Sequence, residues 1–297
     1  MGRADRDRNE LEALQDALAE LDGMIAEAAR AVSAAARDKA VAASGDAWTG
    51  AAGRLAEAWS PAASRFAARL NGLSARIDAA MAPLEDKPQP SLRERVRLSL
   101  GSALFRLTAA KSPLDPLAAV LVELDGLQSV LSAYRQQLLA ARHSVEADLI
   151  ELGGHRPLLV ERLAERALAE GEPTAALAVA VEANLQEIQH LTVELNRQVS
   201  DANILINKLA IEAERAILLR DVLSPDNPEL LVRQEWPDLP HLAPLTGLRE
   251  SGMLSSIEID RRRSKIDARF LERFDVNMNP QDGADYRRSA GPEVHHA

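Results

Sequence analysis

Apolar residues recur every three or four positions over most of the chain, which is the spacing of helices that bury one stripe of side chains. Between Leu11 and Ala35 the steps alternate strictly between three and four for almost four heptads. The alternation returns over 117–152, and over 174–223 it runs for five heptads. Its positions there are Val181, Leu185, Ile188, Thr192, Leu195, Val199, Ala202, Ile206, Leu209, Ala213 and Ala216. This spacing predicts long helices that pack as in a coiled coil.

Clusters of glycine, serine and proline divide this pattern into separate helices. We expect helices over about 5–43, 91–110, 117–152, 157–170, 174–223 and 255–274. A further helical stretch, with a stripe from Phe66 to Leu84, is expected to be interrupted at Ser60 and Pro61, which suit a helix start. Gly153 and Gly154 are expected to end the 117–152 helix in the left-handed conformation.

The predicted fold is all-α, an elongated antiparallel helical bundle or coiled coil, because each apolar stripe needs a partner and short connections favour antiparallel neighbours. The bundle either closes within one chain or is completed by a second copy. We divide the chain into N-terminal coiled-coil helices at 1–87, a long-helix bundle at 88–224, a proline-rich extended segment at 225–248, a C-terminal helix at 249–276 and a disordered tail at 277–297. A hinge is expected at 85–90, where Pro88 and Pro90 disfavour helix.

Composition narrows the classes of function. The 297 residues include no cysteine, which excludes disulfides, Cys-ligated zinc, iron–sulfur clusters and a thiol nucleophile. A formal net charge of -10 makes nucleic acid an unlikely partner, because affinity for it depends on neutralising phosphates. The start of the chain does not resemble a secretory signal, and the longest weakly polar runs fall short of the roughly 18–20 residues that cross a bilayer. We expect a soluble, cytoplasmic protein of bacterial type.

One motif resembles half of a metal site. Glu187 and His190 match the Glu-x-x-His pattern with which four-helix bundles hold two iron or manganese ions. A full site needs a second such pair and two further glutamates, and the chain interior has no second pair. We therefore expect a solvated helix face, with no metal and no cofactor. The usual nucleotide-binding and nucleophile motifs are also missing, and we expect no enzymatic activity.

Polar residues on the longest helix suggest a structural role. Asn196 and Asn203 are one heptad apart and flank the apolar seam. Asparagine in such a place can set the register and number of partner helices. We expect register setting or plain exposure here, in preference to a polar channel.

Two features near the C-terminus are candidate interaction sites. The most concentrated positive patch is formed by Arg261, Arg262, Arg263, Lys265 and Arg269. It suits an acidic protein surface or an anionic membrane, although interleaved acidic residues are more typical of a solvated face. Trp236 lies in the proline-rich tract, where we expect it to plug a groove between helices, with docking to another protein as the alternative.

The longest helix also shows a resemblance. Asn184, Leu185 and Ile188, followed by Val199-Ser200 and by the run 213–219, resemble the helical core of the bacterial toxic-anion-resistance (TelA-like) family. The resemblance covers about 180–223, and the proline-rich tract after Ser224 departs from it. It implies a cytoplasmic stress-resistance protein and carries no site residues.

From the residues themselves we expect a non-enzymatic helical scaffold or adaptor that associates with other proteins or with itself. The alternatives are a stress-resistance protein of the TelA-like type and a helical protein that associates with a membrane surface.

Overall fold

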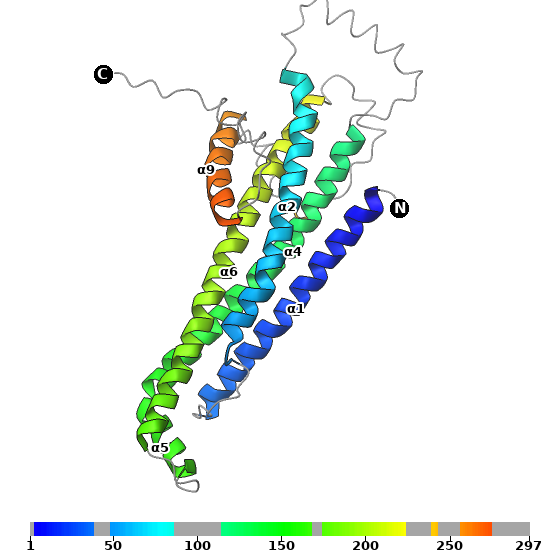
Figure 1. Cartoon of the computed structure of the whole chain (residues 1–297). Helices are drawn as coiled ribbons and strands as arrows, with labels where there is room; N and C mark the ends of the chain where they lie inside the picture. Colours follow the sequence, from blue (N-terminus) through cyan, green and yellow to red (C-terminus); the bar gives the residue numbers. More distant parts are fainter. Residues whose placement is uncertain are drawn as a thin grey trace, which may run out of the picture.

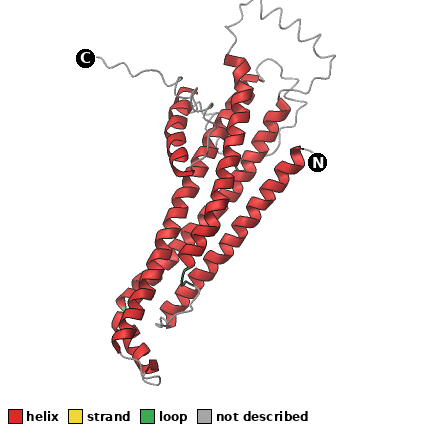
Figure 2. Cartoon of the chain, viewed as in Figure 1, coloured by secondary structure: helices red, strands yellow, loops and turns green. Residues whose placement is uncertain are grey.

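The computed structural model describes residues 3–38, 48–85, 114–167, 174–223, 239–242 and 256–274. These residues form helices and short turns, with no strand among them (Figure 2). The helices are α1 (Arg3–Asp38), α2 (Ala51–Glu85), α4 (Leu114–Gly154), α5 (Arg156–Ala167), α6 (Thr174–Leu223) and α9 (Ser256–Phe274). The prediction of an all-α helical bundle is confirmed.

Four long helices form an elongated bundle, with α5 at one end and α9 along one side (Figure 1). The helices α1 and α2 are an antiparallel pair, and α4 and α6 are a second one. The two pairs lie against each other so that α1 contacts α4 and α2 contacts α6. Around the bundle the order is therefore α1, α2, α6, α4.

Hydrogen bonds fix the direction of neighbouring helices. Arg135 on α4 donates to Asn203 on α6, and Arg142, seven residues later, donates to Asn196, seven residues earlier. These two helices are therefore antiparallel. By contrast, Ser33 near the end of α1 donates to Asp148 near the end of α4, so helices of different pairs run parallel where they meet.

One apolar core runs through the bundle and is built largely from Leu, Ile, Val and Ala. The seam residues from Leu14 to Ala35 on α1 are buried, as the spacing predicts. Two aromatic residues are buried within this core, where the rings of Trp59 and Tyr134 stack with centroids 5.1 Å apart. The contact joins α2 to α4.

The predicted interruption at Ser60 and Pro61 is wrong. The helix α2 continues from Ala51 to Glu85 through both residues. Proline removes one backbone donor and disfavours a helix interior. On either side, however, Trp59 and Ala62 are buried in the core, and this packing holds the backbone helical.

The predicted left-handed end of α4 is also wrong. The helix stops at Gly154, but neither Gly153 nor Gly154 has a positive φ. The backbone instead continues almost directly into α5, with the amide of His155 donating to Leu152 and that of Leu159 donating to His155. Among the described glycines a positive φ occurs at Gly50, just before α2.

A short turn from the proline-rich tract is anchored to the bundle. The buried carboxylate of Asp125 on α4 accepts the backbone amides of His241 and Leu242, each at 2.9 Å. The Leu242 side chain is buried in the core. The remainder of the tract, the expected hinge, the expected helix over 91–110 and the expected tail lie outside the described residues.

By length and composition alone, α4 is apolar enough over Leu117–Gly154 to cross a membrane, which the sequence expectation did not anticipate. The core helix of a soluble bundle meets the same criterion. Here the apolar stripe of α4 packs against α1 and α6.

Candidate functional site

Helix α9 lies along α6 and also touches α2 (Figure 1). Helix α9 buries few apolar side chains in this contact. Ile259 and Phe270 are buried, and Phe274 is half-buried with its ring centroid 5.3 Å from that of Phe270. The other contacts recorded between α9 and the bundle are mainly ionic, so charge pairing has a large part in holding this helix in place.

The inner face of α9 meets carboxylates of the bundle. Four ion pairs connect cations of α9 to anions of α2 and α6, and one connects a bundle cation to an anion of α9. They are Arg262 with Glu214, Arg263 with Asp78 (3.1 Å) and with Glu212 (3.7 Å), Arg273 with Asp201 (2.5 Å) and Lys208 with Asp267 (2.6 Å). We call the bundle side of this contact, Asp78, Asp201, Lys208, Glu212 and Glu214, the charged seat.

Glu212 lies at the middle of the charged seat and is fully buried. Its carboxylate accepts from Lys208 Nζ at 2.7 Å and from Arg215 at 2.6 Å. Burial by itself would raise the pKa of Glu212, but the two cations outweigh it and lower the pKa. Burial acts against the charge of Arg215 as well, and Glu212 and Asp78 together raise its pKa. Glu212 and Arg215 are therefore both charged at neutral pH.

Asp201 joins three helices. Its Oδ2 atom accepts from Trp59 Nε1 on α2 at 3.0 Å and from Arg273 on α9 at 2.9 Å. Hydrogen bonding to Asp201 raises the pKa of Arg273. A single buried carboxylate on α6 therefore ties the last turn of α9 to the core tryptophan.

A second polar connection lies beside the stacked aromatic pair. Tyr134 donates to Gln198 at 2.8 Å, and Gln198 donates in turn to Glu194 at 2.8 Å and to the carbonyl of Leu55 at 3.2 Å. Burial raises the pKa of Tyr134 far above its usual range, so the phenol stays protonated as a donor. The chain of bonds links α4, α6 and α2.

A polar groove of about 300 Å³ opens beside the last turn of α9. It is lined by Trp59, Ser60, Ala63, Ser64, Arg197, Asp201, Arg273 and Phe274. Both guanidinium groups are already engaged, Arg197 with Glu194 and Arg273 with Asp201. The groove is therefore part of the α9 contact and nearly balanced in charge.

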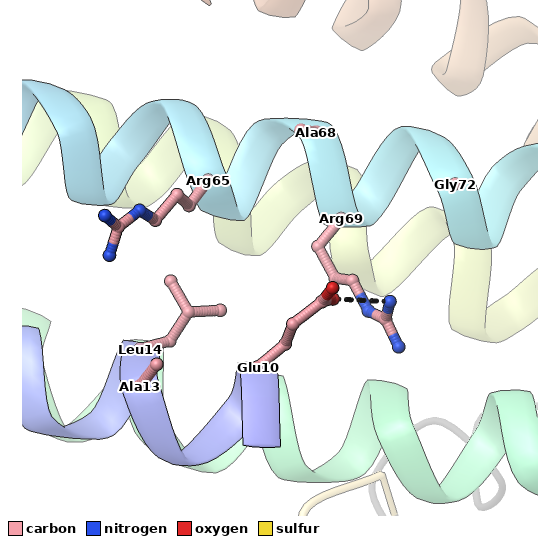
Figure 3. Close-up of a pocket in the computed structure, with 7 residues that line it drawn as sticks. All are labelled: Glu10, Ala13, Leu14, Arg65, Ala68, Arg69 and Gly72. Atoms are coloured by element: carbon pink, nitrogen blue, oxygen red, sulfur yellow. Dashed lines mark hydrogen bonds and ion pairs between the residues drawn. The ribbon is translucent and has the colours of Figure 1, made fainter. Parts of the chain in front are cut away.

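A second groove, of about 460 Å³, lies between α1 and α2 (Figure 3). Arg65 and Arg69 project from α2 toward Glu10 and Leu14 of α1, and Arg69 bonds Glu10 at 2.7 Å. Arg69 also pairs with Glu123 of α4. These contacts connect three helices across an open surface, and we assign the groove no binding role.

The structure divides the predicted positive patch into two faces. Arg262 and Arg263 point to the bundle and form ion pairs there. Arg261, Lys265 and Arg269 are exposed and follow one another at four-residue steps, so they form a single row on the outer side of α9. We call these three residues the outer row.

The other predicted site residues have separate places. Asn196 and Asn203 are not buried, and each accepts a hydrogen bond from an arginine of α4. Glu187 accepts the backbone amide of Gly50, while His190 is exposed. No group of acidic or histidine side chains suited to a metal occurs among the described residues. Trp236 lies outside them.

Sequence reasoning missed the charged seat. On α6 every residue from 211 to 217 is buried, including Glu212, Glu214 and Arg215. Their charges are typical of an exposed helix face, so the sequence does not indicate that they are buried. One signal was available: Lys208, Glu212 and Arg215 alternate in sign at steps of four and three beside the seam, as in a helical ion-pair series.

Comparisons of this chain with protein-family models, with curated proteins and with solved structures find no match.

Proposed function

We propose that this protein is a non-enzymatic helical scaffold that acts through protein–protein association, with a second copy of the chain as the first partner to test. The observation that carries the proposal is a group of exposed apolar side chains where α4, α5 and α6 meet. Ile150 is 76% exposed, Val179 70% and Leu158 43%. We call this part of the molecule the open end.

The position of the open end supports this role. Helix α5 and the adjoining turns of α4 and α6 lie at one extremity of the bundle (Figure 1). The end of α1 reaches the edge of this region, where Arg162 of α5 donates to the carbonyl of Asp38, and the three apolar side chains stay exposed beside it. Isolated exposed apolar residues are common on protein surfaces, but here three adjoining helices each present one. A rod that buries its own stripes along its length and leaves apolar groups at one end is suited to contact at that end.

Introducing a charge at the open end tests the proposal. Val179→Glu should reduce self-association, because a buried contact would have to accommodate an unpaired carboxylate. Light scattering across a concentration series should then give a lower mean mass than that of the unaltered protein at the same concentration.

A matched control lies on the same helix. Val193 is also exposed, at 61%, but lies nearer the middle of α6. Val193→Glu should leave the dimer unchanged. If the unaltered protein is monomeric throughout the series, or if both variants behave alike, association through the open end is wrong.

A second function, association with an anionic membrane surface, is favoured by the outer row. Arg261, Lys265 and Arg269 are exposed on the outer side of α9. Basic side chains near an anionic surface each add about 1 kcal/mol of attraction. Replacing the three with Gln should reduce co-sedimentation with vesicles that contain anionic lipid. Absence of binding by the unaltered protein at low salt would exclude this function.

A stress-resistance role of the TelA-like type stays a proposal based on sequence. The resembling residues, about 180–223, lie within α6. They supply packing and the α6 residues of the charged seat, and they suggest no specific ligand.

A further inference from the structure

We propose that α9 exchanges between two copies of the chain, so that the α9 of one copy occupies the charged seat of the other. The proposed contact is separate from the open end and does not depend on it. Three features of α9 support it: the polar character of its contact, the match between the two sets of charges, and its reach from the nearest anchor.

The contact of α9 with the bundle is more polar than the contacts among the long helices. Its fully buried apolar side chains are Ile259 and Phe270, whereas the long helices share a continuous apolar core. Polar contacts of this kind are typical of segments that separate and reassociate. The arginines of two of these ion pairs, Arg262 and Arg273, are partly exposed although their carboxylate partners are buried, and release of α9 returns both partners to water and salt ions. Release of α9 removes Phe270 from the apolar core and leaves the contacts among the four long helices in place.

The charges of α9 match the charged seat in a specific order. Arg262, Arg263 and Arg273 meet carboxylates, while Asp267, between them in sequence, meets Lys208. Because this one pair has the opposite arrangement of charges, a helix with basic residues alone would place a cation against Lys208. The reversed pair therefore favours α9 in its observed register. A second copy of the chain carries a helix with the same order of charges. When identical chains exchange this helix, each contact that α9 makes with its own bundle is replaced by the same contact with the bundle of the other chain.

The chain has the length that exchange requires. The nearest described point before α9 is Leu242, whose amide is held by Asp125 of α4. Residues 243–255 connect it to Ser256, and a segment of that length spans at most about 45 Å. An α-helix with its side chains is about 10–12 Å across, so a bundle two helices wide measures about 20–24 Å, and the charged seat of a bundle lying alongside is within reach.

Cross-linking of two full-length chains tests the exchange. Arg263 donates to Ser74 of α2 at 3.3 Å, so these two positions face each other across the contact. The chain has no cysteine, and each single-cysteine variant therefore carries one thiol. A Ser74→Cys chain is mixed with an Arg263→Cys chain, and a short bismaleimide spans the gap that the arginine side chain occupies. Both chains also carry Val179→Glu to remove association through the open end.

We expect a cross-linked pair that contains one chain of each kind. The control replaces Arg263→Cys by Arg261→Cys, which places the thiol in the outer row of the same helix. The yield of the mixed pair should be at least five-fold higher with Arg263→Cys, and it should appear faster after incubation at high salt, which weakens the ion pairs.

A single chain with both Ser74→Cys and Arg263→Cys shows whether the substitutions preserve the contact. It should form an internal cross-link at high dilution. If that link forms but the mixed pair never exceeds the Arg261→Cys control, α9 stays with its own bundle and the proposal is wrong. If the internal link is lost, the same comparison is made with Asp78→Cys in place of Ser74→Cys, since Arg263 contacts both. Failure of that mixed pair also overturns the proposal.

Discussion

At the scale of single residues, Asp22 stands apart from the other acidic groups of the core. Its Oδ1 atom is buried on α1 and has no hydrogen-bond partner. Burial raises the pKa of Asp22 from 3.8 to about 6. The folded protein therefore prefers the protonated carboxyl, and at neutral pH the charged form opposes folding.

Asp22→Asn should stabilise the protein at pH 7, because the amide carries no charge to desolvate. We expect a gain of about 1 kcal/mol, since solvent screens much of the effect at this half-buried site. The contribution of Asp22 to the free energy of unfolding increases as the pH falls. As the pH falls from about 6 toward 4, the folded state takes up a proton before the unfolded state does, and stability from this group rises.

Urea unfolding of both proteins at pH 7 and pH 5 provides the measurement. The advantage of Asp22→Asn should shrink at pH 5, where the unaltered carboxyl is largely protonated. Asp16→Asn, on the exposed side of the same helix, is the control and should change little. A variant less stable than the original at pH 7 would show that Asp22 has a stabilising partner.

At the scale of elements, the continuity of α2 through Pro61 has an energetic consequence. Proline in a helix interior costs about 3 kcal/mol relative to alanine, and part of this is offset because proline restricts the unfolded chain. Pro61 is exposed, so no core contact depends on its ring. Pro61→Ala should therefore raise the free energy of unfolding by about 2 kcal/mol.

Thermal unfolding followed by circular dichroism measures this change. Glu57→Ala, at an exposed position one turn earlier, reports the effect of alanine alone and should shift the midpoint only slightly. A lower midpoint for Pro61→Ala would mean that the bundle requires the backbone geometry that proline imposes.

The elements also show what the sequence was able to predict. The three-four spacing located α1, α4 and α6 and their buried stripes, because a helix places such residues on one face whatever its neighbours are. It did not foresee that α2 passes through Pro61 or that α4 ends without a left-handed glycine. Both depend on contacts with segments distant in sequence, such as the packing around Trp59.

For the candidate site the sequence located the helix but not its orientation. It marked 261–269 as a basic segment, yet the division into inner cations and an outer row depends on where α9 lies against the bundle. The charged seat was not predicted, because the burial of charges on α6 depends on the helices that pack against it, α2 and α9. Periodicity within one helix contains no information about a partner that is about 50 residues away along the chain.

At the scale of the whole molecule, the arrangement is two antiparallel pairs that meet through parallel neighbours. Apolar spacing predicts that helices associate, but it does not determine which helix lies beside which. The register of α4 against α6 is marked by polar pairs such as Arg135 with Asn203, whose partners are separated by 68 positions. Such pairs can be identified once the structure brings them together.

The order of the helices around the bundle also affects how the chain assembles. Within each antiparallel pair the two helices are close in sequence, so each pair gains most of its internal contacts at a low entropic cost of loop closure. The parallel contacts, α1 with α4 and α2 with α6, join segments more than a hundred residues apart. We expect them to form later, when the two pairs pack against each other. Synthesis on the ribosome completes α1 and α2 long before α6 emerges, and that first pair must then keep its apolar face from aggregating until the second pair arrives.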